Sequence, residues 1–406
     1  MARILYIVNH LPFLRTHRLP LVLAARDAGH EVRVAYGGDD PPDILEAHGL
    51  PGDRLPFDRA GWRFAEYWKA PSRLAALFHQ YRPDLIHAFP LKMILYAARA
   101  AGVCRPAASP PPALAGSVTG LGYLFTDQRL HKRLLRRWAL QRLRRSLASL
   151  PGKRIIVQND DDLAVLAAAR IAPAEAFCLI PGAGVCVDTF RPRPPEAAEW
   201  DEGAAAAPGL PRMDARPLAV LPARMLRDKG VAEFVGAARI LRREGLSARF
   251  MLVGGLDPGN PAGLAADTLR RWAAEGAIEW AGWVEDMPAL WRQAAVACLP
   301  SYREGCPKAL LEAMAAGRPC VSTRVPGCRE AVRDGVNGRL VAARDTPALA
   351  AALREILTNP DLRRQWGAAG RRLAVERFSL AGVIAQTLAV YEQALAANAK
   401  MDAFDP

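Results

Sequence analysis

The sequence has few cysteines for its length, and none of them is spaced as a metal site requires. Only 7 of the 406 residues are cysteines, and no two of them form a C-x-x-C pair. Zinc sites use cysteine and histidine at short, regular spacings, and a chain this long can build a core without disulfides. We therefore expect reduced, mostly buried thiols in a cytoplasmic protein.

A continuous apolar run long enough to cross a membrane is also missing. The longest uncharged window, residues 106–126, contains four prolines and three glycines. The apolar stretch near the N-terminus is only about six residues long, too short for a secretory signal. We expect neither a transmembrane helix nor a signal peptide.

Acidic residues are absent between Gln128 and Asn159, although this segment carries ten basic ones in a chain of net charge +13. Leucines and Trp138 recur at near-helical spacing between the basic residues. A basic amphipathic helix of this kind binds anionic membrane surfaces. The expected membrane patch consists of Arg129, Lys132, Arg133, Arg136, Arg137, Trp138, Arg144 and Arg145.

Two other interpretations of this basic segment remain open. Its leucines can pack the helix on its own domain and leave a merely solvated basic face. Nucleic-acid binding ranks last, because the aromatic residues are not interleaved as stacking platforms. We expect no nucleic-acid partner.

Short apolar runs alternate with helical patterns along most of the chain, which is typical of parallel β-α-β units. The expected strands are residues 3–8, 31–36, 84–89, 113–118 and 154–159 in the first half, and 217–223, 249–255, 277–283, 295–301, 319–324 and 338–343 in the second. The predicted fold class is α/β, with two doubly wound, Rossmann-like domains facing each other across a cleft. Ligands of such sheets bind beyond the carboxyl ends of the strands.

The expected domain limits follow from composition. Residues 1–190 form the first domain and residues 218–375 the second, and residues 191–217, rich in proline and alanine, form a linker. Residues 376–406 are expected to form a C-terminal helix and tail that can pack back on the first domain.

Two glutamates lie eight positions apart at a strand-to-helix turn, in SYREGCPKALLEAMAAGRPC (301–320). Glu304 falls in the turn, Pro307 suits the first helical position, and Glu312 lies about one and a half turns into the helix. A helix N-terminus favours phosphate, and carboxylates accept hydrogen bonds from sugar hydroxyls. The alternative is a cap-like acid and a solvated surface residue.

This junction and the sequence around it resemble the C-terminal domain of retaining GT-B glycosyltransferases of family 4. LPARMLRDKGVAEF, FMLVGG and WAGWVEDMPALW match that family in order, and Arg224 and Lys229 occupy the positions that contact the donor diphosphate. Such side chains can stabilise a diphosphate leaving group without a metal; the alternative for them is an exposed ion pair. The resemblance implies a nucleotide-sugar donor, with Glu304 catalytic and with Arg224, Lys229, Gly254, Gly305, Lys308, Leu311 and Glu312 binding the donor.

The N-terminal half resembles the branch of this family that acts on lipid-linked precursors of bacterial surface polysaccharides. The matching blocks are FLRTHRLPLVLAARDAGHEVRVA, PDLIHAFPLKMILYAARAAG, SVTGLGYLF and IIVQNDDDLAVL. The resemblance implies a catalytic His87 and an acceptor side formed by Arg18, Lys92, Gly120, Gly122 and Asn159.

Four positions depart from the family pattern. NHLPFLRTH replaces the usual glycine-rich loop, Phe89 stands at the second position of an H-x-H pair, Cys186 replaces an aspartate, and Pro307 replaces a glycine. A core histidine therefore stays open as the alternative for His87.

Metal and nicotinamide chemistry are not expected. DDD at 160–162 precedes a helical run, and acids in a first helical turn account for it better than a metal motif does. No G-x-G-x-x-G follows the first strand. We predict no metal and no cofactor besides the nucleotide sugar, most simply a UDP-sugar.

The expected function is metal-independent transfer of an N-acetylhexosamine or hexose to a lipid-linked saccharide, with an undecaprenyl pyrophosphate carrier as one such acceptor. Retention of configuration is implied by the resemblance. We expect the protein at the cytoplasmic face of the plasma membrane. The alternatives are a nucleotide-sugar epimerase or hydrolase of the same fold, and a nucleotide-sugar-binding protein without turnover.

Overall fold

The structure is a computed structural model of the chain, and it divides into two compact units. Unit 1 comprises Met1–Ala183 and Val383–Pro406, and unit 2 comprises Gly184–Gly382. The described residues are 1–57, 64–103, 111–121, 125, 129–192, 214 and 216–402.

Unit 1 is built on a seven-stranded parallel sheet in the order β3-β2-β1-β4-β5-β6-β7. The strand order reverses between β1 and β4, the switch point at which ligands of doubly wound sheets bind. The strands are β1 (Arg3–Val8), β2 (Glu31–Tyr36), β3 (Gly52–Arg54), β4 (Leu85–Phe89), β5 (Ala113–Val118), β6 (Lys153–Val157) and β7 (Phe177–Leu179).

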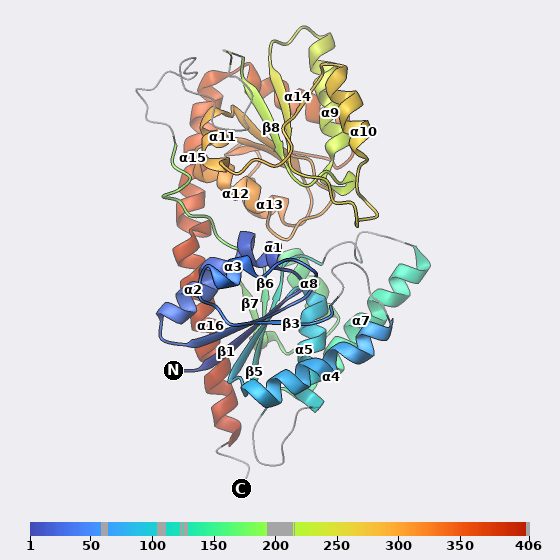
Figure 1. Cartoon of the computed structure of the whole chain (residues 1–406). Helices are drawn as coiled ribbons and strands as arrows, with labels where there is room; N and C mark the ends of the chain where they lie inside the picture. Colours follow the sequence, from blue (N-terminus) through green and yellow to red (C-terminus); the bar gives the residue numbers. More distant parts are fainter. Residues whose placement is uncertain are drawn as a thin grey trace. The chain divides into compact units, whose positions relative to one another are not determined.

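Helices cover both faces of this sheet (Figure 1). On β1, Leu5 and Ile7 contribute to the core under α4, α5 and α7, whereas Ile4, Tyr6 and Val8 face α2 and α16. Successive side chains of a strand point to opposite faces, so a strand covered on both sides reads as a continuous apolar run. The helical segments are α1 (Leu11–Phe13), η1 (Leu14–Arg18), α2 (Leu19–Asp27), α3 (Asp43–Glu46), α4 (Phe64–Tyr81), α5 (Leu91–Val103), α7 (Leu130–Ala148), α8 (Asp160–Ala168), η2 (Ala174–Ala176) and α16 (Leu380–Asp402).

Unit 2 repeats this design with a six-stranded parallel sheet in the order β10-β9-β8-β11-β12-β13. Its switch point lies between β8 and β11. The strands are β8 (Leu218–Pro222), β9 (Arg249–Val253), β10 (Glu279–Trp280), β11 (Val296–Leu299), β12 (Cys320–Thr323) and β13 (Gly338–Val341), and the helical segments are η3 (Arg227–Lys229), α9 (Val231–Arg243), α10 (Ala266–Ala274), α11 (Met287–Gln293), α12 (Lys308–Ala315), α13 (Cys328–Ala331), α14 (Thr346–Leu357) and α15 (Pro360–Phe378).

The predicted fold class is confirmed, since both units are parallel, doubly wound sheets. Every expected strand is present, most within two residues of its expected ends. The sequence analysis missed β3 and β7, which are three-residue strands at the two edges of the unit 1 sheet. An edge strand is covered on fewer sides, so its residues need not form an apolar run.

The structure divides the chain earlier than the composition predicts. Val185 donates its N–H to the Phe378 carbonyl over 2.9 Å, and both Val185 and Phe190 lie in the core of unit 2. The change of unit therefore falls at Ala183–Gly184, before the expected linker. Most of the expected linker, residues 193–213 and 215, lies outside the described residues.

Helix α16 returns the chain to unit 1. Val383 and Val390 pack with Ile156 and Ile180, and Tyr391 and Ala394 join the core beside β1. Among the described helices, α16 alone has the length and apolar composition that a membrane span requires. The buried side chains of α16 attach it to unit 1, although only 28% of its most apolar stretch is buried.

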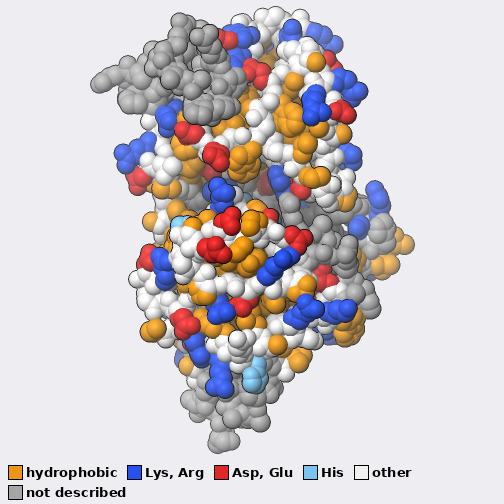
Figure 2. Space-filling view, viewed as in Figure 1, with side chains coloured by type: hydrophobic (Ala, Val, Ile, Leu, Met, Phe, Trp, Pro, Cys, Tyr) orange, Lys and Arg blue, Asp and Glu red, His pale blue; other side chains and the backbone are white. Residues whose placement is uncertain are grey.

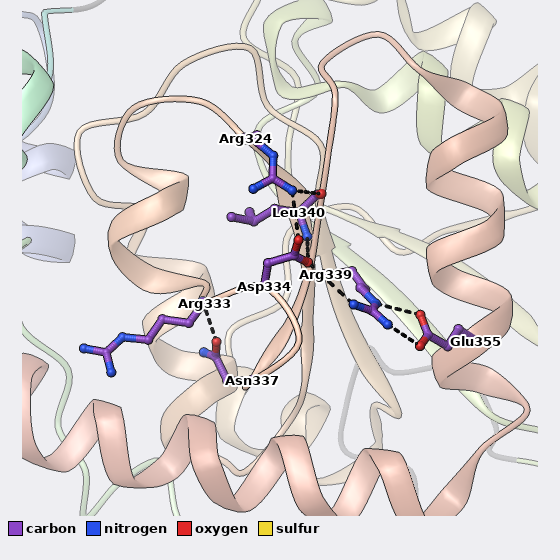
Figure 3. A network of polar contacts seen from close by, with 7 residues as sticks. All are labelled: Arg324, Arg333, Asp334, Asn337, Arg339, Leu340 and Glu355. Atoms are coloured by element: carbon purple, nitrogen blue, oxygen red, sulfur yellow. Dashed lines mark hydrogen bonds and ion pairs between the residues drawn. The ribbon is translucent and has the colours of Figure 1, made fainter.

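A polar network fixes the outer edge of the unit 2 sheet (Figure 3). Asp334 accepts hydrogen bonds from the Leu340 N–H at 3.0 Å and from Arg324 at 2.8 Å. Burial acts to raise the pKa of Asp334, but these hydrogen bonds and the charges of Arg324 and Arg339 lower it overall. Arg339 also forms a two-point contact with Glu355 at 2.6 and 2.7 Å, which ties β13 to α14.

Candidate functional site

Arg224 lies just beyond the end of β8, at the switch point of unit 2. Its guanidinium pairs with the carboxylate of Asp257 in the segment after β9. The Asp257 side chain is 5% exposed, whereas that of Arg224 is 50% exposed. The buried carboxylate therefore holds the guanidinium in place while half of the arginine side chain stays accessible. Asp257 was missed from the sequence, although it follows the strand beside β8.

Gly254 brings the end of β9 against the residue before Arg224. A Cβ atom at Gly254 would lie 1.9 Å from the Ala223 carbonyl oxygen, and the backbone φ of +144° is one that side chains disfavour. Any other residue would push Ala223 and Arg224 out of position. Gly254 thus shapes the site through its backbone.

Lys229 and Glu304 meet across the switch point. Lys229 ends the short turn η3 after β8, Glu304 lies in the loop after β11, and their Nζ and Oε1 atoms are 2.5 Å apart. Gly230 follows with φ +71°, and a Cβ there would lie 2.1 Å from the Pro300 carbonyl oxygen. The loop after β8 can approach the end of β11 this closely because residue 230 is glycine.

Hydrogen bonds join these two loops directly. The Asp228 carbonyl accepts from the Ser301 hydroxyl at 3.0 Å and from the Tyr302 N–H at 2.9 Å. The Tyr302 hydroxyl donates to Glu233 on α9 over 2.6 Å. Burial, together with Glu233, raises the pKa of Tyr302 to about 12, so it keeps this proton at neutral pH. These hydrogen bonds hold the loop that carries Lys229 in a fixed position relative to the loop that carries Glu304.

Glu312 lies on α12 and is almost buried. Lys308, one turn earlier, places its Nζ 3.6 Å from a Glu312 carboxylate oxygen. Burial raises the pKa of Glu312 above its usual value of 4.5, although Lys308 and Trp291 act to lower it. The alternative of a solvated surface residue therefore does not hold for Glu312, because its side chain is only 12% exposed.

Two further predictions about this helix need correction. Leu311 is fully buried in the core of unit 2, so its side chain cannot contact a donor. Pro307 caps α12 instead of occupying its first turn, and the helix begins at Lys308. Gly305 is buried between Glu304 and this cap.

His87 lies inside unit 1 and cannot act as a catalytic residue in this structure. Its side chain is fully buried, with Nδ1 2.5 Å from the Tyr391 hydroxyl and Nε2 2.8 Å from the Ser117 hydroxyl. Burial, with the nearby charge of Arg18, lowers the pKa of His87 well below 6.5, so the ring is neutral. The core-histidine interpretation is correct, because α16 covers the ring with Tyr391.

Lys92 and Asn159 also have structural partners. Lys92 forms a buried ion pair with Glu66 at 2.7 Å, which joins α5 to α4. Asn159 caps α8 by accepting the Asp162 N–H at 2.7 Å. The three aspartates occupy the first turn of α8, as expected. Neither predicted acceptor-side residue presents an exposed polar group.

The remaining acceptor-side residues are Arg18, Gly120 and Gly122. Arg18 ends η1, after β1, and its guanidinium lies 4.8 Å from the Phe89 ring centre. Gly120 follows β5 with a φ of +106°. Gly122 lies outside the described residues. In the described part of the chain, no cluster of three or more histidine, cysteine or acidic side chains is arranged to hold a metal ion.

The expected basic helix is present as α7, and its two ends differ. Ala139, Leu143 and Leu147 pack into the core of unit 1. Leu130 and Leu134 are 70% and 55% exposed. Lys153 and Arg154, counted with the basic segment, belong to β6 instead. Leu135 and Trp138 also pack against this core. The packed-helix interpretation therefore holds for most of α7, and the exposed leucines lie in its first two turns.

Comparison with known proteins gives a consistent assignment for both units. Residues 216–359 match the family "Glycosyl transferases group 1", and residues 3–148 match "Glycosyl transferase 4-like". HepE from Anabaena, solved in complex with UDP and glucose, superimposes with a TM-score of 0.71 at 18% identity, over 97% of this chain and 100% of that one. Each unit thus matches a glycosyltransferase family model, and the chain has the GT-B fold of this neighbour. The Arg224, Lys229 and Glu304 assembly lies within the group 1 match.

Two curated relatives differ in how much of the chain they match. The MMP alpha-(1->4)-mannosyltransferase of Mycolicibacterium hassiacum is 46% identical over 113 residues, which is 28% of either chain. The N,N'-diacetylbacillosaminyl-diphospho-undecaprenol alpha-1,3-N-acetylgalactosaminyltransferase of Campylobacter jejuni is 26% identical over 350 residues, covering 85% of this chain and 87% of that one.

Proposed function

We propose that this protein is a GT-B glycosyltransferase that transfers an N-acetylhexosamine or hexose from a UDP-sugar to a lipid-linked saccharide, with retention of anomeric configuration. The assembly of Arg224, Lys229 and Glu304 at the switch point of unit 2 carries this proposal. The UDP and glucose bound to HepE support the donor class. The diphospho-undecaprenol acceptor named for the Campylobacter relative supports the acceptor class.

The proposed chemistry needs charge stabilisation at the leaving group. The bond between the anomeric carbon and the β-phosphate oxygen breaks, and its electron pair stays on the diphosphate. An acceptor hydroxyl oxygen bonds to the anomeric carbon, and its proton passes to the released diphosphate oxygen. Arg224 and Lys229 supply two fixed positive charges for the developing diphosphate charge. Glu304 accepts hydrogen bonds from hydroxyls of the transferred sugar.

A donor screen tests this function. UDP-, GDP- and ADP-sugars are incubated with a lipid-linked saccharide, and both the released nucleotide and the glycosylated product are measured. We expect transfer from a UDP-sugar that persists in excess EDTA, because Arg224 and Lys229 take the role of a cation. Activity that is lost in EDTA and returns only with magnesium or manganese would contradict the metal-independent mechanism.

The same screen separates the alternatives. Equal nucleotide release with and without acceptor indicates a hydrolase, and a changed sugar without transfer indicates an epimerase. Donor binding without any product indicates a binding protein.

We further propose that unit 1 docks on an anionic membrane surface at the cytoplasmic face. Leu130 and Leu134 project from α7 beside the exposed Arg133 and Arg137. Figure 2 shows hydrophobic and basic side chains together over this end of α7. Exposed apolar side chains among basic ones are the combination that inserts into an interface and pairs with acidic headgroups.

An aromatic residue on α4 extends this surface. Trp68 is 52% exposed, and its neighbour Tyr67 packs edge-on against Trp138 of α7, with ring centres 4.8 Å apart. Tryptophan favours the headgroup region, because its ring is apolar and its N–H polar. The sequence alone gives no reason to group Trp68 with α7, because it lies about sixty positions earlier and only the fold packs its neighbour Tyr67 against that helix.

Vesicle binding tests this membrane surface. The protein should bind anionic vesicles more tightly than neutral ones, and binding should weaken with salt, since the Debye length is about 8 Å at physiological ionic strength. Trp68→Ala should weaken binding. Trp283→Ala, which removes an exposed tryptophan from unit 2, serves as the matched control. Equal binding to neutral and anionic vesicles, or equal effects of the two variants, would contradict the proposal.

A further inference from the structure

Arg18 is a buried arginine at the switch point of unit 1. The residue is 4% exposed, and its guanidinium lies over the ring of Phe89, the last residue of β4. Its Nε atom has no hydrogen-bond partner among the described residues. No carboxylate in the described part of the chain forms an ion pair with it. Two titratable side chains that interact electrostatically with Arg18, His87 and Tyr391, are neutral because burial disfavours their charged forms.

This arrangement is unfavourable for the fold alone. Burial lowers the pKa of Arg18 to about 10, which still leaves the guanidinium charged at neutral pH. A buried charge without a counter-ion destabilises a protein, and an apolar side chain of similar size would pack with less cost. The other buried cation of this unit, Lys92, does have a carboxylate partner in Glu66. Arg18 lacks the counter-ion that its environment requires.

The residues around Arg18 favour binding of an anion beside its guanidinium, because they bring no negative charge of their own. No aspartate or glutamate occurs before Asp27. Arg18 ends the π-helical turn η1, which interrupts the helical segment after β1. Such turns are frequent at functional sites, because they re-aim side chains. His17, the preceding residue, stacks on Phe13 with ring centres 5.0 Å apart, and Phe13 lies 6.2 Å from Phe89. Aromatic rings thus line the region where Arg18 lies.

We propose that Arg18 binds a phosphate oxyanion of the diphosphate that joins the acceptor saccharide to its carrier lipid. The inference rests on the proposed function and adds to it the anchor for the acceptor. Guanidinium groups bind phosphate through two parallel hydrogen bonds, and burial strengthens that interaction. The donor also contains a diphosphate, but Arg224 and Lys229 of unit 2 already provide for it. Experiments can therefore test whether Arg18 binds the diphosphate of the acceptor or that of the donor.

Kinetics with Arg18→Met provide the test. The KM for an acceptor carrying a diphosphate should rise by roughly 10- to 100-fold, as expected for loss of a charged hydrogen bond. The donor KM should stay unchanged, and so should the KM for a saccharide acceptor without phosphate. Arg15→Met, at an exposed position of the same turn, should leave all three constants unchanged. A selective increase in the donor KM would assign the oxyanion to the donor and overturn the proposal.

Equilibrium binding gives an independent measurement. With the donor site saturated by UDP, inorganic pyrophosphate should bind the wild-type protein at least tenfold more tightly than Arg18→Met. The melting temperature of unliganded Arg18→Met should equal or exceed that of the wild type, because the variant removes an uncompensated charge. Arg18→Lys, which keeps the charge, should retain part of the binding.

Each outcome decides the question. If Arg18→Met melts lower than the wild type and pyrophosphate binds both equally, Arg18 is structural and the proposal fails. If no donor supports transfer but pyrophosphate binding still depends on Arg18, the anion site stands and the proposed acceptor is wrong.

Discussion

Replacing Lys229 with methionine should lower kcat by about 100- to 1,000-fold, the loss typical of removing one fixed charge stabiliser from a transition state. Negative charge builds on the diphosphate as the glycosidic bond breaks, and Lys229 is placed at the switch point by the turn η3. Because the interaction strengthens in the transition state, kcat and kcat/KM should fall together. Steady-state kinetics with saturating donor and acceptor measure this effect.

Arg227→Met is the matched control for Lys229→Met. Arg227 begins the same turn and is exposed, and its guanidinium donates to the Pro261 carbonyl at 3.5 Å. Its replacement should change kcat by less than about twofold, in line with an ordinary surface substitution. Lys229→Met also leaves the Glu304 carboxylate without its ion-pair partner, so the melting temperature of each variant must be measured. Wild-type kcat in a folded Lys229→Met protein would exclude the assigned role.

Replacing Glu304 should mainly affect kcat, whereas replacing Glu312 should mainly affect the donor KM. Glu304→Gln should lower kcat, because the hydroxyls of the transferred sugar reorient as the glycosidic bond breaks. Glu312→Gln should raise the donor KM, because a contact with the nucleotide ribose is made equally in the ground and transition states. Each change should be roughly 10- to 100-fold, the value of one charged hydrogen bond.

The raised pKa of Glu312 adds a pH dependence to this prediction. Burial favours the neutral carboxyl group, and a protonated Glu312 is a poorer acceptor for the ribose hydroxyls. The donor KM of the wild type should therefore fall as the pH rises through the raised pKa of Glu312. Glu312→Gln should show no such fall, since it has no proton to lose. Unchanged kinetics in both glutamine variants, or loss of activity only by unfolding, would leave both glutamates without a direct role.

The donor side of the site follows closely from local sequence. Arg224, Lys229 and Glu304 all lie within a few residues of a strand end, and the carboxyl ends of parallel strands meet at one edge of a sheet. A correct strand assignment therefore brings them together without further information. The same reasoning could have predicted Asp257, because this residue follows β9, the strand beside β8.

The roles predicted for residues of unit 1 agree less well with the structure, because the burial and the ion pairing of a side chain depend on the tertiary fold. In sequence, His87 and Lys92 resemble functional residues, one within strand β4 and the other at the start of helix α5. Tyr391 covers His87 from 304 positions away, and Glu66 neutralises Lys92 from the preceding helix. No local pattern reveals either partner. Arg18 is the opposite case, since the fold buries it and the described residues offer no carboxylate to pair with it.

Local sequence patterns were sufficient to predict the two parallel sheets, the basic character of α7 and the residues at the strand ends of unit 2, because hydrophobic periodicity and strand-to-helix spacing are local properties of the chain. Which polar groups stay accessible depends instead on the packing of the folded chain. The tertiary structure assigned Gly184–Phe190 to unit 2, returned α16 to unit 1, enclosed His87 and packed Tyr67, the neighbour of Trp68, against Trp138 of α7. The burial and charge of a side chain depend on elements distant in sequence, and packing sets those contacts.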